Sequence, residues 1–112
     1  MRIFVCGPYT GPSAEQAHLN VCRAMTIATE LMHRGHEPFL PHLSHYLHLH
    51  QVDREASLRY DRWMRWTLTW LDQCDALYFM GRSPGADAEL ARARELKMTI
   101  YRNLGEVPDG DL

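Results

Sequence analysis

The stretch DALYFMGRSPGADAELARARELKMTIYR, residues 75–102, decides the fold. Its first six residues, 75–80, form a short apolar run that is typical of a buried strand and is followed by a glycine. The pair Ser83-Pro84 is a favourable helix start, and the helical pattern continues to about Lys97. A second apolar run over residues 98–102 predicts another strand, so the order is strand, helix, strand.

The N-terminal half has the same order. Residues 2–6 (RIFVC) form a short apolar run before Gly7-Pro8, and a helical pattern then runs from Ser13 to Gly35. Residues 37–41 (EPFLP) predict a second strand that is limited at both ends by proline. This order is the beginning of a right-handed parallel unit.

Three segments complete the chain. Residues 42–51 are rich in histidine and predict an irregular or helical excursion, and residues 54–73 carry a second long helical pattern. Residues 103–112 contain two glycines and a proline, which predicts a C-terminal tail. We therefore expect one domain over residues 1–112 with a three-layer α/β fold. Its core would be a flavodoxin/Rossmann-like parallel sheet of four to five strands flanked by helices.

The composition is that of one ordinary globular domain, with 112 residues, 46% hydrophobic residues and a formal net charge of −2. Such a chain has no electrostatic tendency to bind nucleic acid or an anionic membrane, and no apolar run approaches the roughly 18–20 residues that span a bilayer. Cys6, Cys22 and Cys74 are odd in number and lack CxxC spacing, so we expect no disulfide framework and a cytoplasmic protein. Because a deep pocket removes core from so small a domain, we expect a second subunit to complete any substrate site.

Two loops at the predicted strand ends are rich in glycine and proline: GPYTGPS at residues 7–13 and GRSPGAD at residues 81–87. Ligands of parallel sheets bind at the carboxyl ends of the strands. Glycine lets a backbone approach a ligand closely and helix N-termini attract anions, although tight turns alone would also explain these residues. Neither loop matches GxGxxG or a P-loop, so we expect no nucleotide cofactor.

Glu89 is the most informative single residue. With Ala86 at zero on a helical wheel, Glu89 falls at about −60°, inside the apolar stripe that Leu90 and Ala93 help to define. A carboxylate on a buried face costs free energy unless it has partners or a function. The nearby helix N-terminus would keep it ionised, as a nucleophile requires. The alternative is a glutamate at the edge of the stripe that reaches solvent or pairs with an arginine.

Asn20 and the histidines allow both structural and functional interpretations. Asn20 shares a buried helix face with alanines, and the neighbouring loop backbone is the natural partner for its amide. His42, His45 and His48 have the spacing i, i+3, i+6, but no acidic cluster or cysteine pair accompanies them, so we expect no metal site. His42 follows a strand end and is expected to line the pocket.

One face of the second long helical pattern is aromatic. Such a face is typical of a core or a subunit interface, and it lacks the basic groove that single-stranded nucleic acid requires. Its residues are Tyr60, Trp63, Trp66 and Trp70.

The chain resembles the nucleoside 2-deoxyribosyltransferase-like superfamily, which includes deoxyribosyltransferases, deoxynucleoside 5′-monophosphate N-glycosidases and small bacterial and phage relatives. The resemblance covers residues 1–102 and is carried by VCGPYTGP, by Asn20 with Ala24, and by PFLPH, WLDQCDALYFM and SPGADAELARA. It implies cleavage of an N-glycosidic bond through a covalent glycosyl-enzyme intermediate, resolved by water or by another base.

The resemblance also implies roles for individual residues. Glu89 would be the nucleophile, with Tyr9 against it. Ser83 matches a serine that contacts the 5′-phosphate in the nucleotide hydrolases, and Arg82 beside it would assist. The substrate-binding residues are expected to be Gly7, Thr10, Asn20, His42, Arg82, Ser83 and Gly85.

Thr67 departs from the family, because the deoxyribosyltransferases carry at this position an aspartate that handles the leaving base. Asp61, two turns earlier, could substitute only in a differently arranged pocket. Ser83 favours a nucleotide hydrolase, whereas the small size and the GPYT motif favour the transferase-like relatives. The expected partners are a nucleoside or nucleotide and a second copy of the chain, in a homodimer or higher oligomer. Two interpretations compete with this one. The chain could be a non-catalytic nucleotide-binding or sensing module, or a structural oligomer built on the tryptophan-rich helix.

Overall fold

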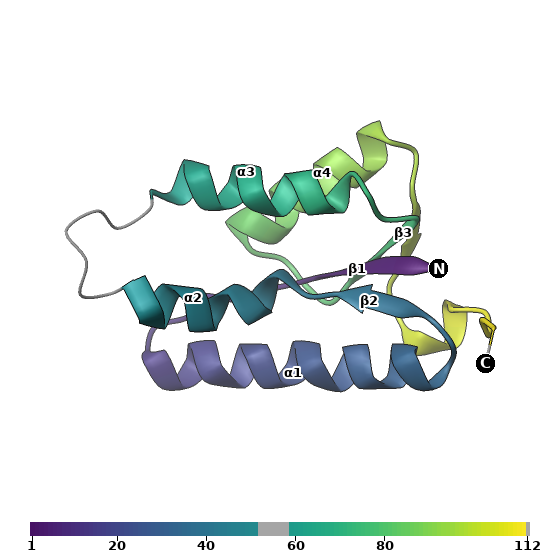
Figure 1. Cartoon of the computed structure of the whole chain (residues 1–112), viewed down its shortest axis with the longest axis horizontal. Coiled ribbons are helices and arrows are strands. Elements are labelled where there is room, and N and C mark those ends of the chain that lie inside the picture. The colour runs from purple at the N-terminus through teal and green to yellow at the C-terminus, as the bar shows by residue number, and fades with distance from the viewer. Residues whose placement is uncertain (52–58, 112) are drawn as a thin grey trace.

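The computed structural model describes residues 1–51 and 59–111. Helices cover both faces of a four-stranded parallel sheet of order β2-β1-β3-β4 (Figure 1). This order matches the first four strands of the flavodoxin-like arrangement, so the predicted three-layer α/β fold is confirmed. In chain order the elements are β1 (Arg2–Cys6), α1 (Ala14–His33), β2 (Glu37–Phe39), η1 (Pro41–Leu43), α2 (Ser44–Gln51), α3 (Tyr60–Leu71), β3 (Ala76–Phe79), α4 (Pro84–Glu95), β4 (Thr99–Tyr101) and η2 (Leu104–Glu106).

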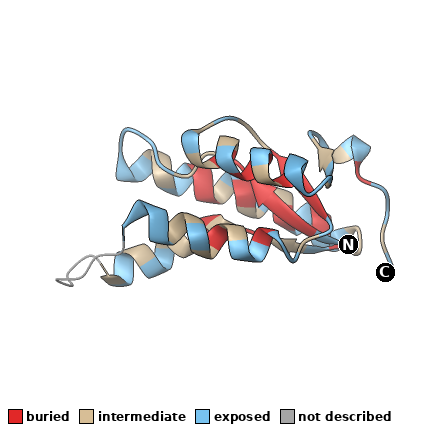
Figure 2. Ribbon diagram, turned by 90° about the horizontal axis from the view of Figure 1, so that it is seen from above, coloured by how far each residue is buried: buried red, intermediate tan, exposed pale blue. Residues whose placement is uncertain are grey.

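The two central strands are apolar throughout because they are buried on both faces. On β1, Ile3 and Val5 belong to the core beneath α1, whereas Phe4 and Cys6 belong to the core beneath α3 and α4. Figure 2 shows the buried residues concentrated in the strands and on the helix faces that turn toward them. Cys6, the last residue of β1, therefore reaches toward α4.

Two serines begin the helices that matter for the site, as the sequence predicted. The Ser13 hydroxyl accepts a hydrogen bond from the Gln16 backbone at 3.1 Å, and the Ser83 hydroxyl accepts one from the Ala86 backbone at 3.0 Å. Gly35 ends α1 with φ of +87°, a conformation that L side chains rarely adopt. The first turns of α1 and α4 thus lie beside the carboxyl ends of β1 and β3.

The C-terminal residues differ from the predicted tail, because residues 103–111 pack back on α1. Val107 is buried in the core beneath α1. The guanidinium of Arg34 donates to the Leu104 carbonyl at 2.6 Å, and the Gly110 backbone donates to the Arg34 carbonyl at 2.7 Å. Glycine and proline content could not separate a free tail from a docked one, because these contacts join distant parts of the chain.

The aromatic helix is α3 (Tyr60–Leu71), which ends two residues before the predicted end at Gln73. Residues 54–58 of the predicted helix lie outside the described residues. Trp70 stacks on Phe39 of the edge strand β2 and Trp66 packs against the same ring at a tilt, with ring centroids 5.7 and 5.9 Å away. The histidine-rich segment is helical, forming η1 and α2. Among the described helices, none combines the length and hydrophobicity that a bilayer crossing needs.

Candidate functional site

A cavity of about 440 Å³ lies at the carboxyl ends of the strands, where the sequence predicted a site. Its walls come from the loops after β1 and β2, the first turns of α4, and parts of α2 and α3. Seven of the nine predicted site residues line this one cavity, namely Gly7, Tyr9, Thr10, His42, Ser83, Gly85 and Glu89. The remaining two, Asn20 and Arg82, lie outside it.

Glu89 contributes the one carboxylate among the described lining residues, and its side chain is 6% exposed. It therefore neither reaches solvent nor forms an ion pair with a described arginine. Burial raises the pKa of Glu89 to about 7, and the neighbouring Cys6 thiol offsets part of that rise. The prediction that the helix terminus keeps Glu89 ionised was incomplete, because desolvation leaves both protonation states populated at neutral pH.

Ser83 and Gly85 form the part of the cavity wall where α4 begins. Since the Ser83 oxygen accepts a hydrogen bond from Ala86, its hydroxyl proton is free to be donated to a ligand. The missing side chain of Gly85 leaves space beside the Tyr60 hydroxyl. Arg82 does not line the cavity, and its exposed guanidinium pairs with Asp87 at 3.2 Å.

Asn20 holds the Tyr9 loop from behind. Its amide nitrogen donates to the Tyr9 carbonyl at 3.0 Å, and its amide oxygen accepts from the Gln16 side chain at 3.1 Å. The expected partnership with the loop backbone is confirmed. The Tyr9 hydroxyl lies 2.7 Å from His45 Nδ1, and burial raises the pKa of Tyr9, so the phenol is protonated and can donate.

His42 is buried and holds the same loop from the opposite direction. Its Nε2 lies 3.0 Å from the Pro8 carbonyl, which can only accept, so Nε2 carries the proton. Burial lowers the pKa of His42, which keeps the ring neutral at pH 7. His42 Nδ1 has no partner among the described residues, so the neutral ring presents an unused acceptor beside the cavity.

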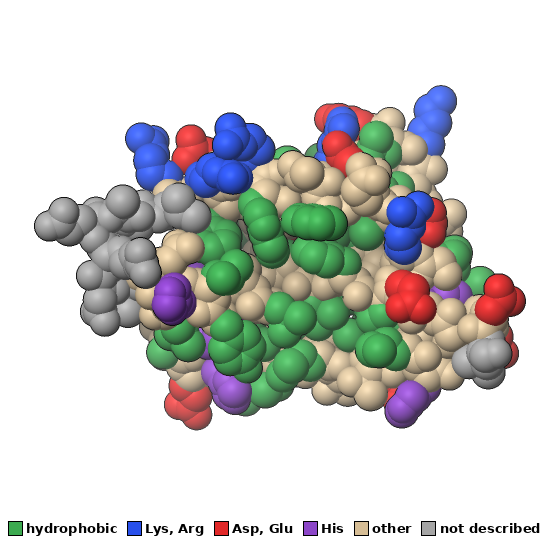
Figure 3. Space-filling model, in the orientation of Figure 1, with side chains coloured by type: hydrophobic (Ala, Val, Ile, Leu, Met, Phe, Trp, Pro, Cys, Tyr) green, Lys and Arg blue, Asp and Glu red, His purple; other side chains and the backbone are tan. Residues whose placement is uncertain are grey.

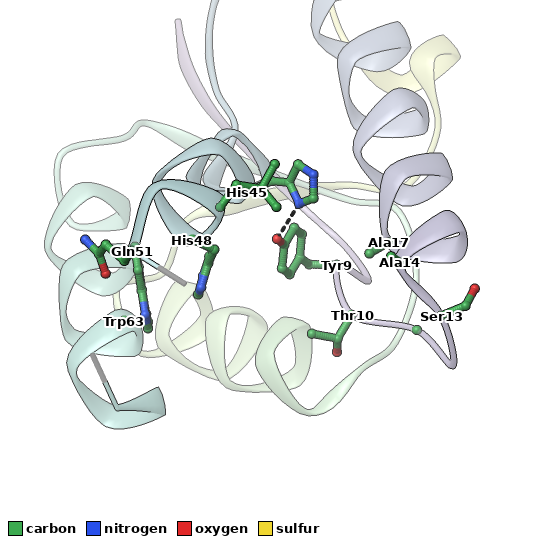
Figure 4. A pocket seen from close by; sticks show the side chains of 11 residues that line it. Tyr9, Thr10, Ser13, Ala14, Ala17, His45, His48, Gln51 and Trp63 are labelled. Carbon is green, nitrogen blue, oxygen red and sulfur yellow. Dashed lines mark hydrogen bonds between the residues drawn. The ribbon is translucent and has the colours of Figure 1, made fainter. Parts of the chain in front are cut away.

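A second cavity of about 570 Å³ adjoins the first and shares Tyr9, Thr10, His48 and Trp63 with it. Figure 4 shows Tyr9 and His48 between the first turn of α1 and Trp63. The rings are stacked, with centroids 5.7 Å apart for Tyr9 and His48 and 3.9 Å apart for His48 and Trp63. Sequence reasoning missed this stack as a site feature; its only signal was the regular spacing of the histidines.

Thr67 lines the first cavity. The threonine that stands in place of the deoxyribosyltransferase aspartate is therefore part of the pocket wall. Asp61 does not line it: its carboxylate is largely exposed and lies 3.6 Å from the Arg59 guanidinium. The structure thus gives no sign that Asp61 substitutes at Thr67. Within residues 1–51 and 59–111, no three His, Cys, Asp or Glu side chains converge as a metal site would require.

The fold and cavity define a small parallel α/β domain with a cavity at the carboxyl ends of its strands. The chain belongs to the family described as "Domain of unknown function (DUF7768)", whose pattern matches residues 1–103. No curated protein matches the chain.

Proposed function

We propose that the chain cleaves the N-glycosidic bond of a deoxynucleoside or its 5′-monophosphate, with Glu89 as the nucleophile. One observation carries the proposal: a buried carboxylate faces a cavity that Tyr9 and Ser83 also line. These three residues are the ones for which the resemblance to deoxyribosyltransferases and nucleotide N-glycosidases implies direct roles. A buried glutamate with a raised pKa in a pocket is typical of a functional group.

The reaction balances in two steps. A carboxylate oxygen of Glu89 forms a bond to the anomeric carbon while the carbon–nitrogen bond breaks, and the base leaves with that electron pair and takes up a proton from solvent. Water, or a second base, then attacks the same carbon, gives up one proton to solvent, and the carbon–oxygen bond breaks to release Glu89 as a carboxylate. With a pKa of about 7, the nucleophilic form of Glu89 is well populated at neutral pH.

A 5′-monophosphate fits the pocket better than an uncharged sugar terminus. The free hydroxyl proton of Ser83 and the N-terminus of the twelve-residue helix α4 lie on one wall. Both stabilise an anion, the hydroxyl by donation and the helix by its dipole. Since Arg82 is paired with Asp87, we assign phosphate recognition to Ser83 and the α4 backbone.

Thr67 favours a second candidate, a nucleotide-binding module without turnover. Thr67 cannot protonate a leaving base at neutral pH, and no second carboxylate joins Glu89 among the described lining residues. A pocket that binds a nucleotide but activates the leaving base poorly would serve as a sensor. The two candidates differ in one observable, the release of free base.

Incubation with each deoxynucleoside and deoxynucleoside 5′-monophosphate, with and without a second free base, tests the proposal by chromatography. We expect release of base, faster from the monophosphate by about tenfold or more because only it can engage Ser83. Release without exchange identifies a hydrolase, and exchange identifies a transferase. Binding without release establishes the module and overturns the enzyme proposal.

We further propose that the enzyme is a cytoplasmic homodimer or higher homo-oligomer. All three cysteines are free, as a reducing compartment allows. Hydrophobic side chains gather on the face that α2, α3 and β2 share (Figure 3). Leu43 of η1, Leu47 of α2 and Trp70 of α3 are each about half exposed. A second copy seated on this face would cover them and close the pocket.

Leu47→Glu is expected to weaken self-association by about tenfold or more, and activity should fall at the dilution where dimers dissociate. Analytical ultracentrifugation and activity over a dilution series measure the two effects. Leu96→Glu is the matched control, because Leu96 is similarly exposed but lies at the end of α4, outside α2, α3 and β2. Full activity in a strictly monomeric sample would contradict the assembly.

A further inference from the structure

A third cavity, of about 300 Å³, lies on the face of the sheet opposite to the helix that carries Glu89. It is bounded by the ends of β3 and β4 and by α1, which covers one face of the sheet while α3 and α4 cover the other (Figure 1). Its polar lining side chains are Arg23 and Thr26 of α1, Tyr78 of β3, and Arg102, which follows β4. It shares no lining residue with the first cavity and is therefore a separate feature of the molecule.

The two arginines of this cavity are available to an anion. Both are exposed, and neither Arg23 nor Arg102 takes part in an ion pair among the described residues. The Arg102 guanidinium lies over the Phe79 ring, 5.1 Å from its centroid. Such a contact uses the flat face of the guanidinium and leaves its N–H edge available, and this edge matches the oxygens of a phosphate group.

Tyr78 adds a neutral donor to the two charges. The residue is only 4% exposed, and its hydroxyl has no hydrogen-bond partner among the described residues. The one unpartnered polar side-chain atom that is sealed from solvent in this part of the chain is His42 Nδ1, so the Tyr78 hydroxyl remains accessible. Burial raises the pKa of Tyr78, so the phenol is protonated and can donate. A ligand in the cavity would supply the acceptor that this hydroxyl lacks.

The lining is poor in groups that would repel an anion. No carboxylate lines the cavity among the described residues. Glu106, near Arg102 along the chain, already accepts from the Asn103 side chain at 2.7 Å and from the Arg102 backbone at 3.3 Å. The Thr26 hydroxyl donates to the Cys22 carbonyl at 3.0 Å. Two positive charges and one neutral donor therefore face a cavity without a counter-ion of its own, which suits a ligand with negative charge and several acceptor oxygens.

We propose that Arg23, Arg102 and Tyr78 form a binding site for a phosphate group, separate from the pocket that Glu89 lines. Near neutral pH a phosphate group carries about two negative charges and three acceptor oxygens, which these three side chains can share. A volume of about 300 Å³ is at the small end of ligand pockets, so the ligand is inorganic phosphate or a small phosphomonoester. The site does not depend on the proposed function, because no residue of the first cavity contributes to it.

NMR signals of the arginine Nε–H groups, followed while inorganic phosphate replaces chloride at constant ionic strength, test the site directly. We expect the Arg23 and Arg102 signals to shift together with one common dissociation constant. In Arg102→Gln the remaining Arg23 signal should report an affinity that is weaker by about tenfold or more, because one of the two charges is lost. Tyr78→Phe should weaken the affinity by about threefold, the effect of one neutral hydrogen bond.

Arg94→Gln is the matched control, because it removes one positive charge from an exposed arginine of α4 that does not line the cavity. It must leave the affinity unchanged. In Ser83→Ala the shifts of Arg23 and Arg102 should persist, which separates this site from the phosphate contact proposed for the first cavity. Circular dichroism checks that each variant folds, and Arg102→Gln alone decides the question if Tyr78→Phe does not.

Glycerol 3-phosphate, titrated in parallel, distinguishes the two sources of the phosphate group. Tighter binding than inorganic phosphate by about threefold or more identifies a phosphomonoester as the ligand, and equal or weaker binding identifies phosphate itself. Arginine signals that do not respond to either probe, or that lose their response in Ser83→Ala, overturn the proposal. An equal loss of affinity in Arg94→Gln and Arg102→Gln would also overturn it, because the effect would then be one of net charge.

Discussion

Glu89→Gln is expected to reduce base release by at least about a thousandfold and, at pH 8, to make the folded chain more stable. The amide keeps the shape of the side chain but has no negative charge with which to attack the anomeric carbon. Its effect on stability has the opposite sign because the buried carboxylate costs free energy when it ionises. Few structural residues combine these two effects.

The sign of the stability change follows from linkage. The pKa of Glu89 is about 7 in the folded state against 4.5 for an ordinary glutamate. Between these values the folded chain binds the proton and the unfolded chain does not, so stability falls as pH rises. The loss approaches about 3 kcal/mol above pH 8, and Glu89→Gln should recover about 1–3 kcal/mol of it.

Urea unfolding at pH 5 and pH 8, with base release measured on the same samples, checks both effects. Glu30→Gln is the matched control, because Glu30 is an exposed carboxylate on α1 and should change neither quantity. The stabilisation should be present at pH 8 and nearly absent at pH 5. Undiminished base release in Glu89→Gln would remove Glu89 from the mechanism.

The part of the site that sequence predicted is the part set by local residues. Ser83 caps α4 and Glu89 falls on its buried face because both depend on the 3.6-residue period and on the residues within one helix. The strand ends were equally local, since short apolar runs ended at Gly7 and Gly81. The helical period of α4 and the ends of these apolar runs together placed the loops and the start of α4 at the carboxyl ends of the strands.

The unpredicted part depends on contacts between distant segments. The contact of the Cys6 thiol with the Ala86 carbonyl requires the register of β1 beneath α4, and the stack of His48 on Trp63 requires the packing of α2 against α3. Arg82 shows a second limit: its place beside Ser83 in the sequence suggested a phosphate contact, but it could not predict the ion pair that the guanidinium forms with Asp87. Sequence position places a residue near the site but does not determine which way its side chain points.

Gly7→Ala is expected to destabilise the chain by about 1–3 kcal/mol and to lower base release by about tenfold or more. A Cβ at Gly7 would lie 2.8 Å from the Cβ of Met80, an atom close to the backbone that cannot move aside cheaply. The sequence attributed Gly7 to close approach of a ligand. The structure adds that the adjacent strand end itself excludes a side chain, so any relief must displace the loop that carries Tyr9.

Gly81→Ala separates this packing effect from a general cost of replacing glycine. Gly81 follows Met80 at the end of β3, and the nearest atom to a new Cβ there is Pro8 Cδ at 3.7 Å, an ordinary contact. Its stability should therefore change by no more than about 0.5 kcal/mol. Thermal unfolding and base release on both variants make the comparison. If Gly7→Ala retained full stability and lost activity, the glycine would serve ligand approach alone, because the clash with Met80 would then have no consequence for the fold.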